Sequence, residues 1–289
     1  MQATCGDVKT FRPEVNDLKS EVQSHWENEV CGARYDSSIS RQQHFNQIEH
    51  VRYTLEPYIA EFAGFAQARG KRVLEIGVGA GSDFHNWVKS GAIATGIDLT
   101  EAAIALSKEH LEVKQLSPES YSLRRADAEN LPFGDNQFDL VYSWGVLHHT
   151  PNTALAFREA FRILKPGGTL KAMIYHIPSW TAWMLWAQNC LLKGRPFQSA
   201  GDAVFNHLES PGTKAYKIPQ AEKMLAEVGF ANVQLTTKLG PGDLLQIKPS
   251  RKYQQFISKV IWKLYPRWLV KRMGHRYGLY LLIKANKPN

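Results

Sequence analysis

The stretch from Val73 to Gly81, Val-Leu-Glu-Ile-Gly-Val-Gly-Ala-Gly, decides the fold. Its first half is apolar apart from Glu75 and predicts a buried strand. The alternating glycines predict a turn where the backbone comes close to a ligand, because glycine has no Cβ atom. Ser82 stands where a dinucleotide-binding GxGxxG motif needs its third glycine, which argues against NAD. Taken alone, the stretch fits either a nucleotide-binding turn or a strand-to-helix turn without a ligand.

Short apolar runs alternate with helical segments after Gly70. This order predicts βαβ units, and hence a parallel sheet that helices cover. A further helix and two strands extend the series toward the C-terminus. The predicted strands are residues 72–76, 94–97, 121–126, 140–143, 169–175, 233–237 and 277–285, and the predicted helices are residues 84–89, 101–111, 154–164 and 220–228.

Acidic side chains follow the second and third predicted strands. Asp98 lies 21 residues beyond Gly77, at the tip of a strand where a carboxylate accepts the ribose hydroxyls of an adenosine. Asp127, in the run from Arg125 to Phe133, is placed to accept the adenine amino group. Two more segments complete the series, a strand with its exit loop at residues 138–149 and a helix end, Pro-Gly turn and strand at residues 162–170.

These five ordered motifs resemble the class I methyltransferases that depend on S-adenosylmethionine (SAM), in particular the group similar to ubiquinone and menaquinone C-methyltransferases. The resemblance covers residues 70–175, and residues 219–237 less closely. It implies a Rossmann-like α/β fold with a seven-stranded, mostly parallel sheet whose last strand is antiparallel. It also implies SAM as cofactor and S-adenosylhomocysteine as product, with the methionine part held by Glu75, Gly77, Gly79 and Gly81, the ribose by Asp98 and Leu99, the adenine by Asp127 and Ala128, and the sulfonium above Trp144 and Val146.

The N-terminal part of the chain is predicted to be a helical lid. Residues 14–69 have helical periodicity around a turn-rich stretch at residues 31–40. Trp26, Cys31-Gly32, Arg52 and Tyr53 resemble the lid of bacterial and fungal members of the group. Arg52 is predicted either to pair with the SAM carboxylate or to be an ordinary surface arginine.

The predicted organisation is one decorated domain. It comprises a lid at residues 1–69, a SAM-binding core at 70–176, a substrate-cap insertion at 177–218, and the rest of the core at 219–289 with a basic amphipathic insertion at 238–276. The two insertions follow the fifth and sixth strands, and ligands of open α/β sheets bind at the carboxyl ends of the strands. Both insertions are therefore expected to roof the acceptor pocket.

Methyl transfer from a sulfonium is an in-line displacement, so the protein mainly has to hold the acceptor against the methyl group in a dry cavity. A base is needed only when the acceptor has a proton to lose. The candidates near the strand ends are His148, Tyr175 and His176, of which His176 is preferred for substrate contact. We interpret His149 as structural.

The expected acceptor is a small, largely apolar or aromatic organic molecule. Residues Ser143 to Val146 lack the (Asp/Asn)-Pro-Pro-(Tyr/Phe) pattern that resembles enzymes methylating the bases of nucleic acids, so nucleic acid is not an expected partner. The first insertion is rich in aromatic residues, which either contact the acceptor or only pack the insertion. The predicted substrate contacts are Trp180, Trp183, His207 and Tyr216.

The net charge of +8 is concentrated at the C-terminus. Residues 248–289 contain eleven Lys or Arg residues and no acid, which leaves 24 basic against 27 acidic residues in the rest of the chain. Residues 249–275 have apolar positions from Phe256 to Leu269 at helical spacing, with Lys259, Lys263 and Arg267 on another face and a break expected at Pro266. This helix is predicted to cover the pocket, with peripheral membrane contact as the alternative and attraction to nucleic acid third.

Several classes of protein are not expected. The first residues contain no apolar run and no stretch is long enough to span a membrane, so a cytoplasmic protein is expected. The three cysteines lie far apart in the sequence, which predicts free thiols and no metal site. Two alternatives to a soluble small-molecule methyltransferase stay open: a SAM-binding regulatory or accessory protein without activity, and a methyltransferase that acts on a lipid-like acceptor at the membrane surface.

Overall fold

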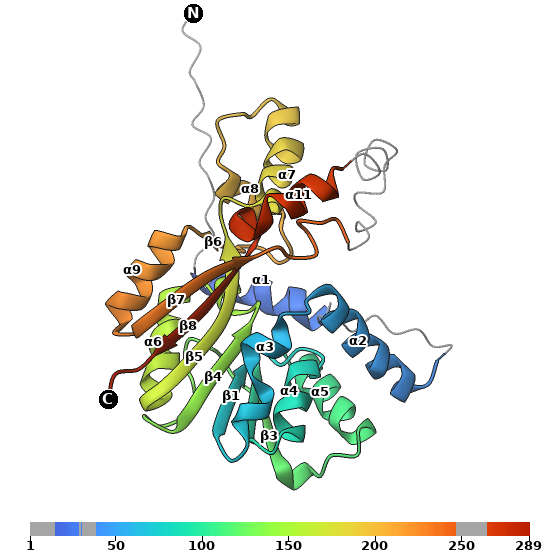
Figure 1. Cartoon of the computed structure of the whole chain (residues 1–289), viewed down its shortest axis with the longest axis vertical. Helices are drawn as coiled ribbons and strands as arrows, with labels where there is room; N and C mark the ends of the chain where they lie inside the picture. The colour runs from blue at the N-terminus through green and yellow to red at the C-terminus, as the bar shows by residue number, and fades with distance from the viewer. Residues whose placement is uncertain (1–14, 29, 31–38, 247–264) are drawn as a thin grey trace, which may run out of the picture.

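A central β-sheet organises the molecule (Figure 1). The computed structural model describes residues 15–28, 30, 39–246 and 265–289. The strands lie in the order β3-β2-β1-β4-β5-β8-β7, and β8 runs antiparallel to both of its neighbours. The predicted α/β fold and its antiparallel strand are therefore confirmed. The strands are β1 (Arg72–Ile76), β2 (Ile93–Asp98), β3 (Tyr121–Arg125), β4 (Phe138–Trp144), β5 (Leu164–His176), β7 (Ala231–Lys238) and β8 (Tyr280–Asn286).

A short strand that the sequence pattern does not predict joins this sheet. Strand β6 (Ala215–Tyr216) pairs in parallel with Tyr175 and His176 at the end of β5. It lies inside the segment predicted as the substrate cap, so the end of that segment is part of the sheet. Two residues are too few to produce a recognisable alternation of apolar and polar side chains.

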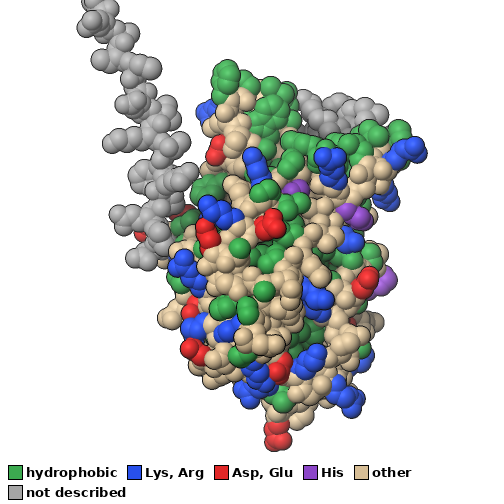
Figure 2. Space-filling view, turned by 60° about the vertical axis from the view of Figure 1, so that its left-hand side comes forward, with side chains coloured by type: hydrophobic (Ala, Val, Ile, Leu, Met, Phe, Trp, Pro, Cys, Tyr) green, Lys and Arg blue, Asp and Glu red, His purple; other side chains and the backbone are tan. Residues whose placement is uncertain are grey.

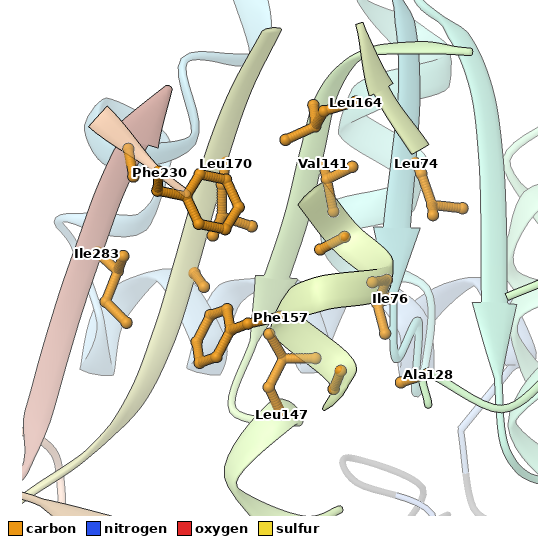
Figure 3. Close-up of a cluster of buried hydrophobic side chains, with 14 of the residues drawn as sticks. Leu74, Ile76, Ala128, Val141, Leu147, Phe157, Leu164, Leu170, Phe230 and Ile283 are labelled. Atoms are coloured by element: carbon orange, nitrogen blue, oxygen red, sulfur yellow. The ribbon is translucent and has the colours of Figure 1, made fainter. Parts of the chain in front are cut away.

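Helices cover both faces of the sheet, as the alternating pattern predicts. One face is packed against α6 (Thr153–Ile163) and α9 (Ile218–Val228), in a cluster that includes Leu225. Figure 3 shows Phe157 of α6 and Ile283 of β8 in this cluster. The other face is packed by α4 (Ser82–Lys89) and α5 (Glu101–Val113), with Trp87 and Leu111 fully buried. Burial of these side chains supplies the main stabilisation of the sheet.

The N-terminal helices lie against α4 and α5. They are α1 (Val15–Asn28), α2 (Arg41–Leu55) and α3 (Ile59–Ala63), followed by the 3-10 turn η1 (Phe65–Ala68). Ser40 begins α2 as a capping box with Gln43. Phe45 is fully buried and stacks on His110 of α5, with 4.3 Å between the ring centroids. Helix α2 is thereby fixed to the core.

The insertions form a cap above the ends of β5 and β7 (Figure 1). The first contains α7 (Trp180–Asn189), η4 (Leu191–Lys193) and α8 (Ala200–His207), and the second contains α11 (Arg267–Arg272) and η6 (Gly274–Tyr277). The buried Asp243 connects them: one carboxylate oxygen accepts from the backbone N–H and hydroxyl of Thr181 at 3.0 and 2.8 Å, and the other accepts from the N–H groups of Gly240 and Leu279 at 2.9 and 2.7 Å.

The predicted amphipathic helix falls largely outside the described residues, because residues 247–264 are not among them. Helix α11 begins directly after Pro266, as expected for a break at that position. Within the described ranges, no helix has both the length and the apolar character that crossing a membrane requires. Cys190 is a buried free thiol, whereas Cys5 and Cys31 lie outside the described residues.

Candidate cofactor and acceptor site

The glycine turn after β1 has the conformation that only glycine adopts without strain. Gly77, Gly79 and Gly81 have φ angles of 82°, 52° and 79°. A Cβ atom on Gly77 would lie 2.2 Å from Cγ2 of Val146, so the exit of β4 packs directly against the turn. This contact places Val146 beneath the turn, which is where the resemblance to the methyltransferases puts the floor of the sulfonium site.

Asp98 at the tip of β2 is held by its own loop. Oδ1 accepts from the N–H and the hydroxyl of Thr100 at 3.1 and 2.9 Å, and Oδ2 accepts from the N–H of Gly79 at 3.2 Å. Burial raises the pKa of Asp98, although these hydrogen bonds favour the charged form. These protein donors orient the carboxylate at the tip of β2.

Arg52 of α2 pairs with protein carboxylates. Its Nε lies 3.0 Å from Oδ1 of Asp83, its Nη2 pairs with Oδ2 of the same residue, and its Nη1 lies 3.6 Å from Glu56. The hydroxyls of Tyr53 and Tyr142 also donate to Asp83, both at 2.8 Å. Neither of the two roles predicted for Arg52 from the sequence describes this arrangement. The guanidinium connects α2 to Asp83 of α4.

Glu75, predicted to face the methionine part of SAM, is buried at the end of β1. Burial raises its pKa well above the usual range, and the nearby charge of Asp83 adds to the effect. Glu75 is therefore a buried polar group directly before the glycine turn, and its contact with SAM stays a prediction.

Helix α1 lies across the predicted adenine site. Nζ of Lys19 is 2.7 Å from Oδ2 of Asp127 and 2.6 Å from Oε2 of Glu129. Oδ1 of Asp127 accepts from the N–H of Glu129 at 2.9 Å, and Ala128 is buried beside it. The sequence pattern for the lid did not identify Lys19, which contacts a residue predicted to bind the cofactor.

Aromatic side chains surround Trp144 at the end of β4. The ring centroids of Tyr58, Phe62 and Tyr280 lie 6.0, 5.8 and 6.1 Å from that of Trp144. Tyr58 and Phe62 come from the N-terminal helical region and Tyr280 comes from β8, so three distant segments meet here. This wall favours a ligand with apolar or aromatic surface, and sequence reasoning missed Tyr58 and Tyr280 as parts of it.

A hydrogen-bonded cluster lies at the ends of β4 and β5. The hydroxyl of Tyr175 donates to Oε1 of Glu209 at 2.7 Å, and Nε2 of His149 lies 3.4 Å from Oε2 of the same carboxylate. Nδ1 of His149 is 2.8 Å from Oγ of Ser210 and 3.1 Å from Oγ1 of Thr213. Contacts with His149 and Tyr175 lower the pKa of Glu209. We call Tyr175, Glu209 and His149 the carboxylate cluster.

The carboxylate cluster includes one predicted residue and two others. Tyr175 was a predicted catalytic candidate, His149 was interpreted as structural, and Glu209 was not singled out. Trp26 of α1 packs edge-on against His149, with 5.4 Å between the ring centroids. Glu209 has a positive φ of 54°, which is uncommon outside glycine. Such backbone strain gathers at functional sites, but the sequence gives no sign of it.

The other two predicted bases are less exposed. His148 is fully buried, with its ring between those of Tyr175 and His149 at 4.0 and 4.2 Å, and burial, His149 and Lys214 hold its pKa well below the usual value. Both ring nitrogens of His148 are buried in this structure, and its role as a base stays a prediction. His176 is also buried, its Nδ1 donates to the carbonyl of Gly278 at 2.9 Å, and burial lowers its pKa.

The predicted substrate residues are distributed over the cap. Trp180 and Trp183 pack edge-on at 5.3 Å, and both also contact Tyr277, at 6.4 and 5.1 Å. These contacts match the alternative in which the aromatics pack the insertion. Tyr216 lies in β6 beside His176, and His207 ends α8. Of the four, Tyr216 is the one paired with the end of β5.

A second cluster of titratable groups lies between α2 and the core. Glu49 Oε1 is 2.6 Å from Nδ1 of His85 and 3.4 Å from Nε2 of His110. Three metal-ligating atoms thus lie within 4.8 Å of one another. Oε2 of Glu49 is 2.5 Å from Nζ of Lys114, however, so an ammonium group already neutralises the carboxylate. We interpret the cluster as an ionic contact that holds α2.

Comparison with known proteins agrees with this geometry. Residues 74–172 match the family described as "Methyltransferase domain". The chain contains a class I SAM-dependent methyltransferase domain. The glycine turn and the oriented Asp98 fit SAM: Gly77, Gly79 and Gly81 leave the backbone of the turn without side chains, and Gly79 and Thr100 hold the carboxylate at the strand tip.

The methyltransferase domain is similar to curated relatives with different acceptors. A sterol 24-C-methyltransferase from Pneumocystis carinii is 29% identical over 250 residues, 80% of this chain and 60% of that protein. A ubiquinone biosynthesis O-methyltransferase from Pseudomonas fluorescens is 32% identical over 135 residues, 44% of this chain and 53% of that protein. The chain thus spans about half to three fifths of the length of these relatives.

The fold is also found among solved structures. Phosphoethanolamine N-methyltransferase 2 from Haemonchus contortus, in complex with phosphomonomethylethanolamine and S-adenosylhomocysteine, has a TM-score of 0.58 and 16% identity. The match covers 93% of this chain and 61% of that chain. At this identity the likeness shows the fold alone.

Proposed function

We propose that the chain transfers a methyl group from SAM to a small, largely apolar or aromatic organic acceptor. The observation that carries the proposal is the position of the carboxylate cluster. Tyr175 lies two residues beyond Met173, the partner of Trp144 in the sheet register, so Tyr175 and Trp144 lie on the same face. Proton-accepting groups thus follow directly after the predicted sulfonium floor.

SAM supplies an electrophilic methyl group on a positively charged sulfur. The glycine turn and Asp98 would hold its methionine and ribose parts, and Trp144 and Val146 would support the sulfonium. Helix α1 and the cap would exclude water from the acceptor, which is what an in-line displacement between two bound molecules requires. These roles of the lid and the cap are part of the proposal.

The carboxylate cluster would remove a proton from an acceptor hydroxyl, amine or activated carbon. The hydroxyl of Thr213 donates to the carbonyl of Ser210 at 2.7 Å, so its oxygen is free to accept from Nδ1–H of His149. His149 and Glu209 would together take up the proton that the acceptor loses, with the carboxylate beside Nε2 of His149 stabilising the charge. The relatives include C- and O-methyltransferases, so the acceptor atom is not assigned.

The test is incubation of the full chain with SAM and a library of phenols, quinone precursors and sterols. We expect release of S-adenosylhomocysteine and an acceptor that gains the mass of one methylene group. SAM binding without turnover on any acceptor or cell extract would instead favour the non-catalytic alternative. Tighter binding of NADH than of SAM would contradict the cofactor.

A further inference from the structure

We propose that the outer surface of the cap and α11 docks on an anionic lipid membrane. Eleven large apolar side chains are exposed on the described residues, and seven of them belong to this surface. Four lie on α7, η4 and the segment after η4, and three lie on α11 and directly after it. We call these seven residues the docking surface: Trp183, Leu191, Leu192, Phe197, Trp268, Leu269 and Met273. Figure 2 shows hydrophobic side chains gathered at the top of the molecule with Lys and Arg beside them.

The two parts of the docking surface belong to one structural unit. Trp183 of α7 contacts Tyr277 of η6 with 5.1 Å between the ring centroids, and Asp243 connects both insertions. Helix α11 turns Val270 fully inward, while Trp268 remains 70% exposed. Leu192 is 76% exposed and Phe197 is completely exposed. Such side chains contribute nothing to the packing of the fold, but they suit insertion into the headgroup region of a bilayer.

The charges around the docking surface identify the occupant. Exposed basic residues flank both parts, Lys193 and Arg195 beside η4 and Lys271, Arg272 and Arg276 at α11 and η6. Residues 177–201 and 265–289 contain no Asp or Glu. The exposed Asp202 at the start of α8 is an acid near this surface, but the residues that flank the apolar side chains in sequence are mainly basic, which matches acyl chains beneath anionic headgroups. A second copy of this chain would bring these cations against each other, which disfavours a symmetric dimer through this surface.

The docking surface lies beyond the end of β5, on the side where the acceptor is expected (Figure 1). Docking would turn the acceptor site toward the lipid and would let a membrane-borne acceptor enter from the bilayer. The proposal itself concerns lipid binding and stands independently of methyl transfer. Its test therefore measures binding to vesicles and not turnover.

The experiment is co-sedimentation of the full chain with vesicles of phosphatidylcholine alone, and with about one third phosphatidylglycerol added. We expect binding only to the anionic vesicles, strongest at low ionic strength and weaker near physiological salt, where the Debye length is about 8 Å. Leu192→Ser combined with Phe197→Ser should lower the partition coefficient about tenfold or more. Lys271→Gln combined with Arg272→Gln should lower it about fivefold per residue at low salt.

Matched control variants remove the same kinds of side chain from surface positions outside the docking surface. Val51→Ser with Leu155→Ser removes exposed apolar side chains from α2 and α6, and Lys108→Gln with Lys223→Gln removes two exposed charges from α5 and α9. Both controls should bind vesicles like the wild type, and all four variants should keep the wild-type melting temperature and SAM affinity.

Three results would overturn the proposal. The first is absence of binding to anionic vesicles at low ionic strength. The second is an equal loss of binding in the surface variants and their controls. The third is a dimer in sedimentation equilibrium that the Leu192 and Phe197 substitutions dissociate, because the surface would then belong to a second copy of the chain.

Discussion

Nζ of Lys19 lies 2.7 Å from Oδ2 of Asp127, which ties helix α1 to the residue predicted to bind the adenine of SAM. The lysine also pairs with Glu129 at 2.6 Å, so one ammonium group bridges two carboxylates next to the cofactor site. We propose that these contacts hold the predicted lid over the cofactor site, so that its opening for cofactor release would break both ion pairs.

Lys19→Ala should therefore speed the release of the cofactor. An ion pair of this partial exposure stabilises the closed lid by about 1 kcal/mol, which corresponds to about a fivefold faster dissociation of SAM. Stopped-flow fluorescence measures this rate. Lys108→Ala removes an exposed lysine of α5 and should leave the rate unchanged. An unaltered rate in Lys19→Ala would mean that the lid does not control release.

Asp98→Ala should weaken SAM binding by about 1 to 3 kcal/mol, because hydrogen bonds between the carboxylate and the ribose are lost. Titration calorimetry measures the affinity directly. Asp135→Ala is the control, since Asp135 is 66% exposed and pairs with Arg162 far from the glycine turn. Wild-type affinity in Asp98→Ala would remove the ribose assignment.

Glu209→Gln should lower kcat about a hundredfold or more while SAM affinity stays near that of the wild type. The amide keeps the shape of the side chain but no longer stabilises a protonated His149. Turnover is compared with that of Glu222→Gln, an exposed position on α9. If the acceptor has no proton to lose, Glu209→Gln will retain wild-type turnover, and the carboxylate cluster then has no part in proton transfer.

His148 should make the folded state less stable in acid. Its pKa is well below the usual value in the folded protein, whereas an unfolded histidine has a pKa of about 6.5. Below about pH 6.5 the unfolded chain therefore binds a proton that the folded chain does not, and stability falls by about 1.4 kcal/mol per pH unit.

Urea unfolding of His148→Gln at several pH values tests this sign. The unfolding free energy of the wild type minus that of the variant should fall by about 1 kcal/mol as the pH is lowered from 7.5 to 5.5. Gln47→Ala, which removes an uncharged side chain from an exposed position of α2, should follow the wild type over the same range. Parallel curves for His148→Gln and the wild type would show that His148 does not titrate between the folded and unfolded states.

The sequence by itself determined the sheet and the glycine turn that follows its first strand. The run from Val73 to Gly81 predicts a strand and a turn because burial and the glycine backbone act over a few neighbouring residues. The structure places β1 at Arg72–Ile76 and the positive φ angles at the glycines that follow. Asp98 could be assigned to the strand tip for the same reason, since the position depends on local periodicity.

Only the tertiary structure decided the partners of these groups. Lys19 meets Asp127 across 108 positions of sequence, Tyr175 meets Glu209 across 34, and Arg52 meets Asp83 across 31. Each pair forms because the packing of separate elements brings opposite charges or a donor and an acceptor together. The spacing of polar residues in the sequence does not reveal such partners. A hydrogen bond between distant residues depends on how the fold brings them together, and not on their neighbours in the chain.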